Sequence, residues 1–364
     1  MRRAAVAVIA TTMAVSMAAC GKAGDDKKSD SSSSSSGGTT AKIGLLLPDS
    51  VTARYEKFDK PYFEAKVKEL CSGCTVEYNN ANASAATQAQ QVSSMITKGV
   101  KVIVISAQDS AAIKSSIQQA VNKGIKVVAY DRLAQGPVSA YVSFDNVEVG
   151  KLQGEALLAS LGSKATPSAN VVMINGDDAD PNAAQFKKGA HEALDGKVKI
   201  AYEQSGLWKD TVAGQKMSAA ITQLGAKKIA GVYSANDGMA GGIATVLKGA
   251  GISNIPLTGQ DAELAGIQRI VAGTQSSTVY KAFKPEAEAA ATLAVDLAQG
   301  KSISSLATTT QTSGSGNKVP SQLLVPVSVT KANIKETVIK DGLYTVAQIC
   351  TADYAKACKA AGLE

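Results

Sequence analysis

Charged and amide side chains lie within three residues after several apolar runs that have the length and composition of buried strands. They are Asp131 and Arg132 after residues 127–130, Asn236 after 229–233, Asp261 after 255–258 and Lys281 after 277–280. In open parallel α/β sheets, ligands bind in the crevice outside the carboxyl ends of the strands. Carboxylates accept hydrogen bonds and ammonium groups donate them, so this set suits a ligand with many hydroxyl groups, which need both.

A further segment of the same kind, residues 175–182, follows the run 171–174 and contains Asp180 and Asn182. An Asp or Asn after a strand often caps the next helix, and this alternative is open for Asp180 and Asn236 in particular. The recurrence of such residues at strand ends in both halves of the chain favours a ligand site.

Catalytic and cofactor motifs are missing from the sequence. The single histidine, His191, leaves little room for Ser-His-Asp or Cys-His chemistry, and no G-x-S-x-G stretch occurs. Neither a G-x-G-x-x-G nor a G-x-x-x-x-G-K-[ST] motif is present, and the segment 314–318 lacks the spacing of a phosphate loop. The acids at 177–180 lack the pattern of a calcium loop. We therefore predict a binding protein without cofactor or metal and not an enzyme.

The rest of the chain from Lys42 alternates between strand-like runs and amphipathic helical stretches, which predicts an α/β fold with parallel sheets. Its length of 364 residues favours two domains over one. The predicted strands are 43–47, 102–105, 127–130, 171–174, 198–202, 229–233, 255–258, 277–280 and 320–329. The predicted helices are 62–70, 85–97, 113–122, 147–161, 184–194, 212–224, 239–248, one that begins near Leu264, and 284–297. These elements form two βαβ series, and hence two doubly wound lobes.

The N-terminus has the features of an export signal. Arg2 and Arg3 precede an apolar run, 4–15, that is too short to span a bilayer permanently. Ala18-Ala19-Cys20-Gly21 resembles a bacterial lipobox, so residues 1–20 are predicted to be a lipoprotein signal peptide with lipidation at Cys20; a plain secretory cleavage site is the alternative. Residues 21–41, rich in Ser and Gly, read as a linker that holds the protein off the membrane.

Without Cys20, four cysteines remain, an even number that suggests two disulfides in an oxidising compartment. Cys71 and Cys74 are close enough in sequence to bridge, and so are Cys350 and Cys358. A redox role is disfavoured because C-x-x-C normally opens a helix, whereas here it follows one. A zinc site is disfavoured because the pairs lie far apart in sequence and His191 is near neither.

The formal net charge is +7, and it falls to +5 without Arg2 and Arg3, since 36 basic residues then face 31 acidic ones. This small excess is scattered, with no basic run that contains interleaved aromatics, and we expect no nucleic-acid partner.

Several of these segments resemble the periplasmic sugar-binding proteins of ABC transporters, and among them the D-xylose-binding members in particular. The similarity is strongest in TGQDAELAGIQRIVAGTQSSTVYK at 258–281 and SFDNVEVGKLQGEAL at 143–157. It implies the type I periplasmic-binding-protein fold, with two doubly wound parallel-sheet lobes joined by a multi-strand hinge. The lobes implied are 42–149 with 282–318, and 150–281 with 319–364.

The resemblance also implies which residues contact the sugar. TARYEKF supplies Arg54 and Tyr55, the latter where the xylose-binding members have a Trp, and YDR supplies Asp131 and Arg132. DADPN supplies Asp180 and Asn182, with Pro181 departing from the family pattern, and GLWKD supplies Trp208. SANDGMAGG, GQDAELAG and TVYK supply Asn236, Asp261 and Lys281. Tyr55 and Trp208 would clamp the apolar faces of the sugar ring from opposite lobes.

The function implied is that of a monomeric extracytoplasmic lipoprotein, anchored to the cell membrane, that binds D-xylose or a related aldose and delivers it to an ABC permease. D-glucose, ribose, a nucleoside or a quorum signal are the alternative ligands. A repressor of the same core fold would need an N-terminal helix-turn-helix, where this chain has a signal peptide and linker. A sugar-modifying enzyme would need a base and a metal that the sequence lacks.

Overall fold

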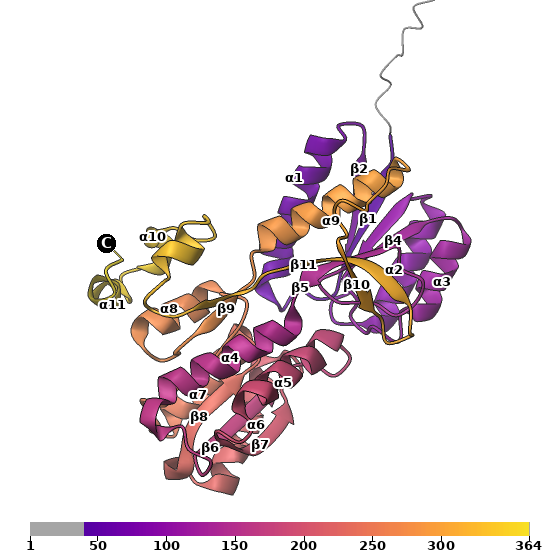
Figure 1. The fold of residues 1–364 in the computed structure, drawn as a ribbon. Coiled ribbons are helices and arrows are strands. Elements are labelled where there is room, and N and C mark those ends of the chain that lie inside the picture. Colours follow the sequence, from indigo (N-terminus) through magenta and orange to yellow (C-terminus); the bar gives the residue numbers. More distant parts are fainter. Residues whose placement is uncertain (1–39, 364) are drawn as a thin grey trace, which may run out of the picture. The chain divides into compact units, whose positions relative to one another are not determined.

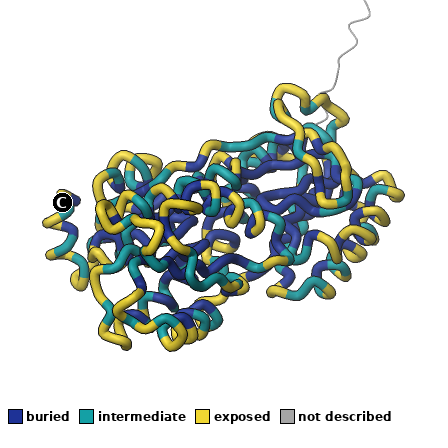
Figure 2. Tube along the Cα trace, turned by 60° about the horizontal axis from the view of Figure 1, so that its bottom comes forward, coloured by how far each residue is buried: buried dark blue, intermediate teal, exposed yellow. Residues whose placement is uncertain are grey.

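The computed structural model describes residues 40–363. The predicted signal peptide with Cys20, and the predicted linker apart from its last two residues, lie outside the described residues. Among residues 40–363, each helix is too short or too polar to cross a membrane. Figure 2 shows buried positions running through the inside of the fold, with the exposed positions on helices and loops around them.

The first lobe is built on a seven-stranded sheet with the order β10-β11-β5-β4-β3-β1-β2 (Figure 1). All neighbouring strands are parallel except β10 and β11, which are antiparallel. The strands are β1 (Lys42–Leu47), β2 (Thr75–Asn80), β3 (Val102–Ile105), β4 (Lys126–Tyr130), β5 (Ala140–Phe144), β10 (Thr309–Thr312) and β11 (Lys318–Leu324). The carboxyl ends of β1, β3, β4 and β5 therefore lie along one edge of the sheet.

Helices cover both faces of this sheet, which is why its strands read as continuous apolar runs. Along β1, Ile43 and Leu45 pack with α1 (Lys60–Leu70) and α9 (Phe283–Ala298). Leu46 points the other way and packs with α2 (Ala85–Thr97) and α3 (Lys114–Asn122). Alternate residues of a strand thus serve separate cores on its two sides.

The second lobe has a parallel three-stranded sheet with the order β7-β6-β8. Its elements are β6 (Asn170–Asn175), β7 (Lys199–Ser205), β8 (Ile229–Ser234), α4 (Asn146–Leu161), α5 (Pro181–Leu194), α6 (Asp210–Leu224) and α7 (Asp237–Gly249). The strand predicted at 255–258 is wrong as a full strand, since only Leu257 forms a bridge, to Val232. Pro256 has no N–H to donate to a longer ladder.

Glycines allow α4 and α5 to pack unusually closely. A Cβ atom on Gly150 would lie 1.9 Å from the carbonyl oxygen of Phe186, and one on Gly189 would lie 1.8 Å from that of Val147. Only glycine fits at these two crossing points, and the close contact fixes the position of α5, which carries Asn182 and Phe186, against α4.

A small antiparallel sheet of β9 (Thr278–Tyr280) and β12 (Val327–Val329) adjoins α8 (Leu264–Ala272). The single strand predicted at 320–329 is thus divided, and its first part remains in the first lobe, where β11 pairs with β5 as far as Leu324. The predicted boundary at Lys318 is corrected accordingly to a position after Leu324. Three connections join the two lobes, from β5 to α4, from β9 to α9 and from β11 to β12.

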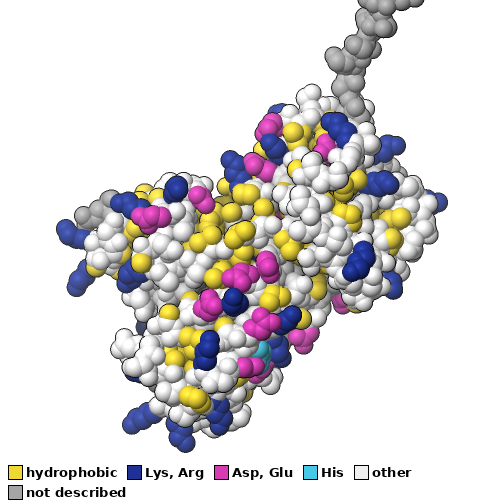
Figure 3. Space-filling view, in the orientation of Figure 1, with side chains coloured by type: hydrophobic (Ala, Val, Ile, Leu, Met, Phe, Trp, Pro, Cys, Tyr) yellow, Lys and Arg dark blue, Asp and Glu magenta, His cyan; other side chains and the backbone are white. Residues whose placement is uncertain are grey.

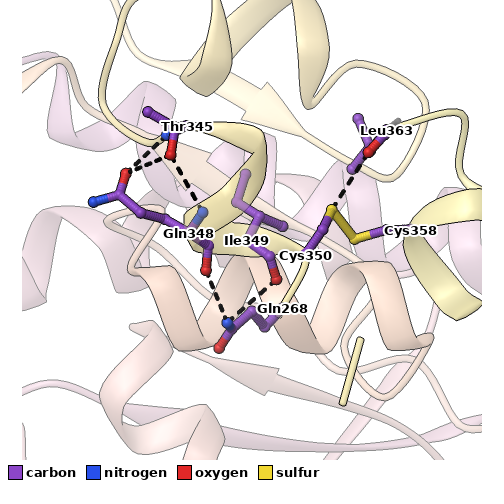
Figure 4. Close-up of a disulfide and its surroundings, with 7 residues drawn as sticks. All are labelled: Gln268, Thr345, Gln348, Ile349, Cys350, Cys358 and Leu363. Atoms are coloured by element: carbon purple, nitrogen blue, oxygen red, sulfur yellow. Dashed lines mark hydrogen bonds between the residues drawn. A yellow bond between two sulfur atoms is a disulfide. The ribbon is translucent and has the colours of Figure 1, made fainter. Parts of the chain in front are cut away.

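The C-terminal segment, with α10 (Val346–Ile349) and α11 (Ala355–Ala360), packs against α8 (Figure 4). Gln268 on α8 donates hydrogen bonds of 3.3 Å from Nε2 to the carbonyl oxygens of Gln348 and Ile349. Thr345 and Gln348 form a capping box that begins α10. The disulfide between Cys350 and Cys358, with Cα atoms 5.8 Å apart, closes this segment.

A second disulfide joins Cys71 and Cys74, whose Cα atoms are 5.3 Å apart, between α1 and β2. Both pairs are therefore local staples that tie one helix end to the residues after it, which is the arrangement that their sequence spacing predicts.

We expect non-reducing peptide mapping of the exported protein to yield cross-linked peptides for both pairs. Replacing Cys350 and Cys358 together by Ser should lower the free energy of unfolding by about 2 kcal/mol, because the unfolded chain gains the entropy that the closed loop removes. The matched change at Cys71 and Cys74 should cost less, since that loop is shorter. Recovery of four free thiols would contradict the pairing.

Candidate functional site: a polar cavity between the two lobes

All the residues that are predicted from the sequence to contact a ligand line one cavity between the two lobes. The space between its lining atoms, including the part open to solvent, is about 300 Å³. The nominated residues are Arg54, Tyr55, Asp131, Arg132, Asp180, Asn182, Trp208, Asn236, Asp261 and Lys281, and Thr52, Phe186 and Gln260 complete the lining. Their contact with a ligand stays a prediction.

Asp131 lies at the centre of the first lobe's contribution. It directly follows β4 and has a positive φ of 59°, a conformation that its surroundings must hold in place. Its N–H donates to the carbonyl oxygen of Val142 at 2.8 Å. Its own carbonyl oxygen accepts from the hydroxyls of Tyr141 and Ser143, and also from Asn182 Nδ2 of the second lobe at 2.9 Å. The backbone of Asp131 is thus fixed from both lobes.

Arg54 is held almost completely by carboxylates. Its Nε and Nη2 donate to the two oxygens of Asp59 at 2.8 and 3.2 Å, and its Nη1 donates to Asp131 Oδ1 at 3.1 Å. Nη2 also donates to Glu286 Oε2. With these donors in use, one N–H of Nη1 remains for a ligand, so the guanidinium acts mainly to orient Asp131.

Lys281 and Arg132 link the cavity's carboxylates across the lobes. Lys281 Nζ lies 3.1 Å from Asp261 Oδ1 and 3.7 Å from Asp131 Oδ1. Arg132 Nε lies 3.0 Å from Asp180 Oδ2. All these side chains are buried, and each charge is therefore balanced by an opposite charge within ion-pair distance.

Asp180 and Asn236 do cap helices, as the alternative interpretation requires. Asp180 Oδ1 accepts from the N–H of Asn182 at the start of α5, and Asn236 Oδ1 accepts from the N–H of Met239 at the start of α7. Both side chains also line the cavity. The cap and the site are therefore not alternatives here, since one oxygen serves the helix and the rest of the group faces the cavity.

The aromatic residues are arranged differently from a simple two-ring clamp. Trp208, with a φ of 57°, packs edge-on against Phe186 with ring centroids 6.2 Å apart. A Cβ atom on Gly176 would lie 2.0 Å from the Trp208 ring, so glycine is needed there. The hydroxyl of Tyr55 donates to Asp131 Oδ2 at 2.9 Å. Tyr55 thus supports Asp131 in addition to presenting its ring.

Three lining residues, Phe186, Gln260 and Thr52, are not predicted from the sequence. Phe186 lies one helical turn after Asn182, and this spacing puts both on one side of α5. Gln260 immediately precedes Asp261, and Thr52 lies two residues before Arg54. Proximity in sequence to a nominated residue was the available signal in each case, but an apolar residue in a helix reads first as core.

Several buried polar atoms that line the cavity have no hydrogen-bond partner within residues 40–363. They include Asn182 Oδ1, Trp208 Nε1 and Gln260 Oε1. Buried polar groups nearly always have partners, so acceptors and a donor left open around one cavity indicate a ligand that supplies both kinds of group. Among residues 40–363, no group of three or more His, Cys, Asp or Glu side chains is placed to hold a metal ion.

Comparison with known proteins identifies the family to which this two-lobed fold belongs. Residues 43–302 match the family described as periplasmic binding protein domain. The chain belongs to the periplasmic binding protein family. The members of this family are extracytoplasmic solute-binding proteins of transporters and not enzymes.

Two curated relatives of this family are named D-xylose-binding periplasmic protein. The one from Escherichia coli (strain K12) is 38% identical over 317 residues, which cover 85% of this chain and 92% of the relative. The one from Haemophilus influenzae is 36% identical, with 84% and 90% covered. A solved ABC transporter solute-binding protein from Clostridium phytofermentans with bound β-D-glucose has a TM-score of 0.76 and 29% identity, covering 85% of this chain and 99% of that structure.

Burial raises the pKa of several carboxyl groups in and beneath this periplasmic-binding-protein cleft. It raises the pKa of Asp180 to about 6, of Asp237 to about 7 and of Glu263 to about 8. Burial also raises the pKa values of Asp59 and Glu286, against the attraction of Arg54.

Asp131 differs from these five carboxyl groups in the direction of its pKa shift. Burial alone would raise its pKa, but the charges of Arg54, Lys281 and Arg132 together outweigh burial and hold the pKa below its ordinary range. The central carboxylate of the cavity is therefore ionised throughout the physiological pH range.

These shifts predict that the protein is more stable at pH 5 than at pH 8. A carboxyl with a raised pKa holds its proton more tightly in the folded than in the unfolded state, so the free energy of unfolding falls as the pH rises from about 4 to about 8. Each such group contributes at most about 1.4 kcal/mol per pH unit. Below pH 4 the depressed pKa of Asp131 acts in the opposite direction.

Urea denaturation at pH 5 and pH 8 measures this difference. Glu286→Gln, which removes one titrating group, should reduce it. Greater stability at pH 8 than at pH 5 in the parent protein would contradict these pKa shifts.

Proposed function

We propose that this chain is the sugar-binding component of an ABC importer, and that it encloses a monosaccharide, D-xylose before others, in the cavity between its lobes. The observation that carries the proposal is the set of buried, unpaired polar atoms around this cavity, Asn182 Oδ1, Trp208 Nε1 and Gln260 Oε1. No group in the described part of the chain pairs with them, and the hydroxyls of a sugar offer the donors and acceptors that they lack.

The charged groups fit the same class of ligand. Asp131 and Asp261 accept hydrogen bonds from hydroxyls, while Arg132 and Lys281 donate to them. Hydrogen bonds that involve a charged partner are roughly twice as strong as neutral ones. Because these charges already balance one another within the protein, an uncharged ligand such as a sugar leaves no charge unpaired.

D-xylose comes first among sugars because the two curated relatives described above carry the name D-xylose-binding periplasmic protein. A pentopyranose lacks the exocyclic CH₂OH group of a hexose. A pocket rejects such an added group by a clash or by leaving a polar atom unpaired.

D-glucose is the second candidate. The Clostridium phytofermentans structure has β-D-glucose bound, and Tyr55 stands where the xylose-binding members have the larger Trp. A smaller aromatic side chain leaves more room in that part of the cavity.

Closure of the lobes on the sugar is the output that an ABC permease would recognise. Contacts such as Arg132 with Asp180 and Asn182 with the carbonyl of Asp131 join the two lobes in this structure, and separation of the lobes would break them. A ligand shifts the hinge equilibrium by its extra contacts in the closed state. Lipidation at Cys20, with residues 21–41 as a tether, would keep the monomeric protein on the outer face of the cell membrane, close to the permease.

Calorimetric titration of the purified protein with D-xylose and D-glucose tests the proposed ligand. We expect D-xylose to bind more tightly, by about tenfold or more, the range that a single disfavoured group produces. Equal affinity for the two sugars would defeat the preference for D-xylose, and no binding of either, or of ribose, would defeat the sugar-binding proposal itself.

Asp261→Ala should abolish sugar binding and leave the fold intact, because the side chain lines the cavity and caps no helix. Its ion-pair partner Lys281 keeps a second carboxylate, Asp131, at 3.7 Å. Each hydrogen bond to a charged group is worth roughly 1.5 to 3 kcal/mol. Asp210→Ala, which removes an exposed carboxylate outside the cavity, is the matched control and should bind normally. Wild-type affinity of Asp261→Ala in calorimetry would remove Asp261 from the site.

A further inference from the structure

Asp237 is a completely buried carboxylate beneath the cavity that does not line it. It is the first residue of α7 and follows the cavity residue Asn236. Three side-chain and backbone donors converge on it. Gln275 Nε2 donates to Oδ1 at 2.6 Å, and Oδ2 accepts from the Thr278 hydroxyl at 2.8 Å and from the N–H of Glu263 at 2.9 Å. The carboxylate is thus buried and joins three segments of the second lobe, around residues 263, 275 and 278.

These bonds enclose the backbone of Asp261 from both sides. Before it, the N–H of Asp237 donates to the carbonyl oxygen of Gln260 at 3.0 Å. After it, the N–H of Ala262 donates to the Thr278 hydroxyl at 3.1 Å, which in turn donates to Asp237, and the next N–H, that of Glu263, donates to Asp237 directly. The loop 260–263 is thus attached to Asp237 at three points: to its backbone N–H, to its carboxylate through the Thr278 hydroxyl, and to its carboxylate directly.

The loop needs such support because its backbone is strained. Asp261 has a φ of 90° and Ala262 a φ of 50°. Residues with side chains occupy this left-handed region only when the surrounding structure fixes them there. Without its attachments, the loop would relax toward negative φ and turn the Asp261 side chain away from Lys281.

Two glycines make room for the carboxylate. A Cβ atom on Gly259 would lie 1.9 Å from Asp237 Oδ1, and one on Gly266 would lie 2.4 Å from Asp237 Cγ. A glycine is therefore required on each side of the loop, because any larger residue there would clash with the Asp237 side chain.

Arg269 holds both the backbone of Asp237 and one of the donors to its side chain, Gln275. Arg269 donates from Nη2 to the carbonyl oxygen of Asp237 at 2.6 Å and from Nε to Gln275 Oε1 at 2.9 Å. Gln275 is thereby oriented with its NH₂ group toward Asp237. Gln275, Thr278 and Glu263 all donate to the Asp237 side chain, so it accepts hydrogen bonds through both of its oxygens.

We propose that Asp237 is a positioning residue for the sugar site: it holds the strained loop 260–263 so that Asp261 faces the cavity and Lys281. The inference rests on the proposed sugar-binding function. It assigns to Asp237 an effect on affinity that acts through Asp261 and not through contact with the sugar.

The direct test is Asp237→Asn, which keeps the size of the side chain but has one oxygen fewer, so that at least one of its donors loses its acceptor. We expect the affinity for D-xylose in calorimetry to fall by about tenfold or more, as loss of a hydrogen bond to a charged group does. Hydrogen exchange of the backbone amides of Ala262 and Glu263, measured without sugar, should become faster while exchange in β6 and β8 stays unchanged. Unchanged affinity together with unchanged exchange would overturn the proposal.

Thr278→Val is the second variant, for the case that Asp237→Asn does not fold. It removes only the hydroxyl that joins Ala262 to Asp237, and it should likewise weaken binding and speed exchange at Ala262. Thr245→Val is the matched control, because that hydroxyl is exposed on α7 and bonds only the carbonyl oxygen of Gly241. Equal affinity of the Thr278 and Thr245 variants would contradict the proposal.

A double-mutant cycle separates positioning from a general loss of stability. In an Asp261→Asn background, Asp237→Asn should cost much less affinity than it does in the wild type, since its effect passes through Asp261. Additive losses would mean that Asp237 acts by another route. If the wild-type protein binds no sugar, the proposed function fails, and hydrogen exchange at Ala262 and Glu263 still decides whether Asp237 holds the loop.

Discussion

A buried charge is tolerated only where opposite charges and hydrogen bonds surround it, and this constraint shapes the cavity between the lobes. Arg54, Arg132 and Lys281 are all buried there, each beside at least one carboxylate. Asp131 lies between two of them, Arg54 and Lys281. Two of these ion pairs, Arg132 with Asp180 and Lys281 with Asp131, also join the two lobes across the cavity.

The fold supplies this arrangement through its strand ends. Asp131 follows β4, Asn236 follows β8 after one residue, and Lys281 follows β9. Glycines at 176, 259 and 266 then leave space where a Trp ring or a carboxylate must fit. The charged residues provide the polar groups of the cavity, and the glycines leave room for the side chains that lie around them. On the outer face shown in Figure 3, by contrast, Lys and Arg side chains are scattered among Asp and Glu side chains.

Much of this could be predicted from the sequence, because local patterns determine it. The helix at 85–97 has the predicted bounds, and the runs at 102–105 and 127–130 are strands. Features that depend on distant partners could not be predicted. Glu286, which holds Arg54, is 232 residues away in sequence. The strand β5 (Ala140–Phe144) was not predicted, and the lobe boundary was predicted at Lys318, whereas the structure has it after Leu324. In both cases pairing within the sheet decides which residues form a strand of the first lobe. Phe186 has the pattern of a core residue in the sequence, and only the packing of α5 on α4 shows that it lines the cavity.

The fluorescence of Trp208 provides the most direct test that the sugar binds in this cavity. It is the only tryptophan in the sequence and it lines the cavity, where its Nε1 has no hydrogen-bond partner among residues 40–363. Titration with D-xylose should therefore change the emission of the protein in a saturable way, with the same dissociation constant that calorimetry gives. Calorimetric binding with no change in the emission of Trp208 would place the sugar elsewhere and contradict the account.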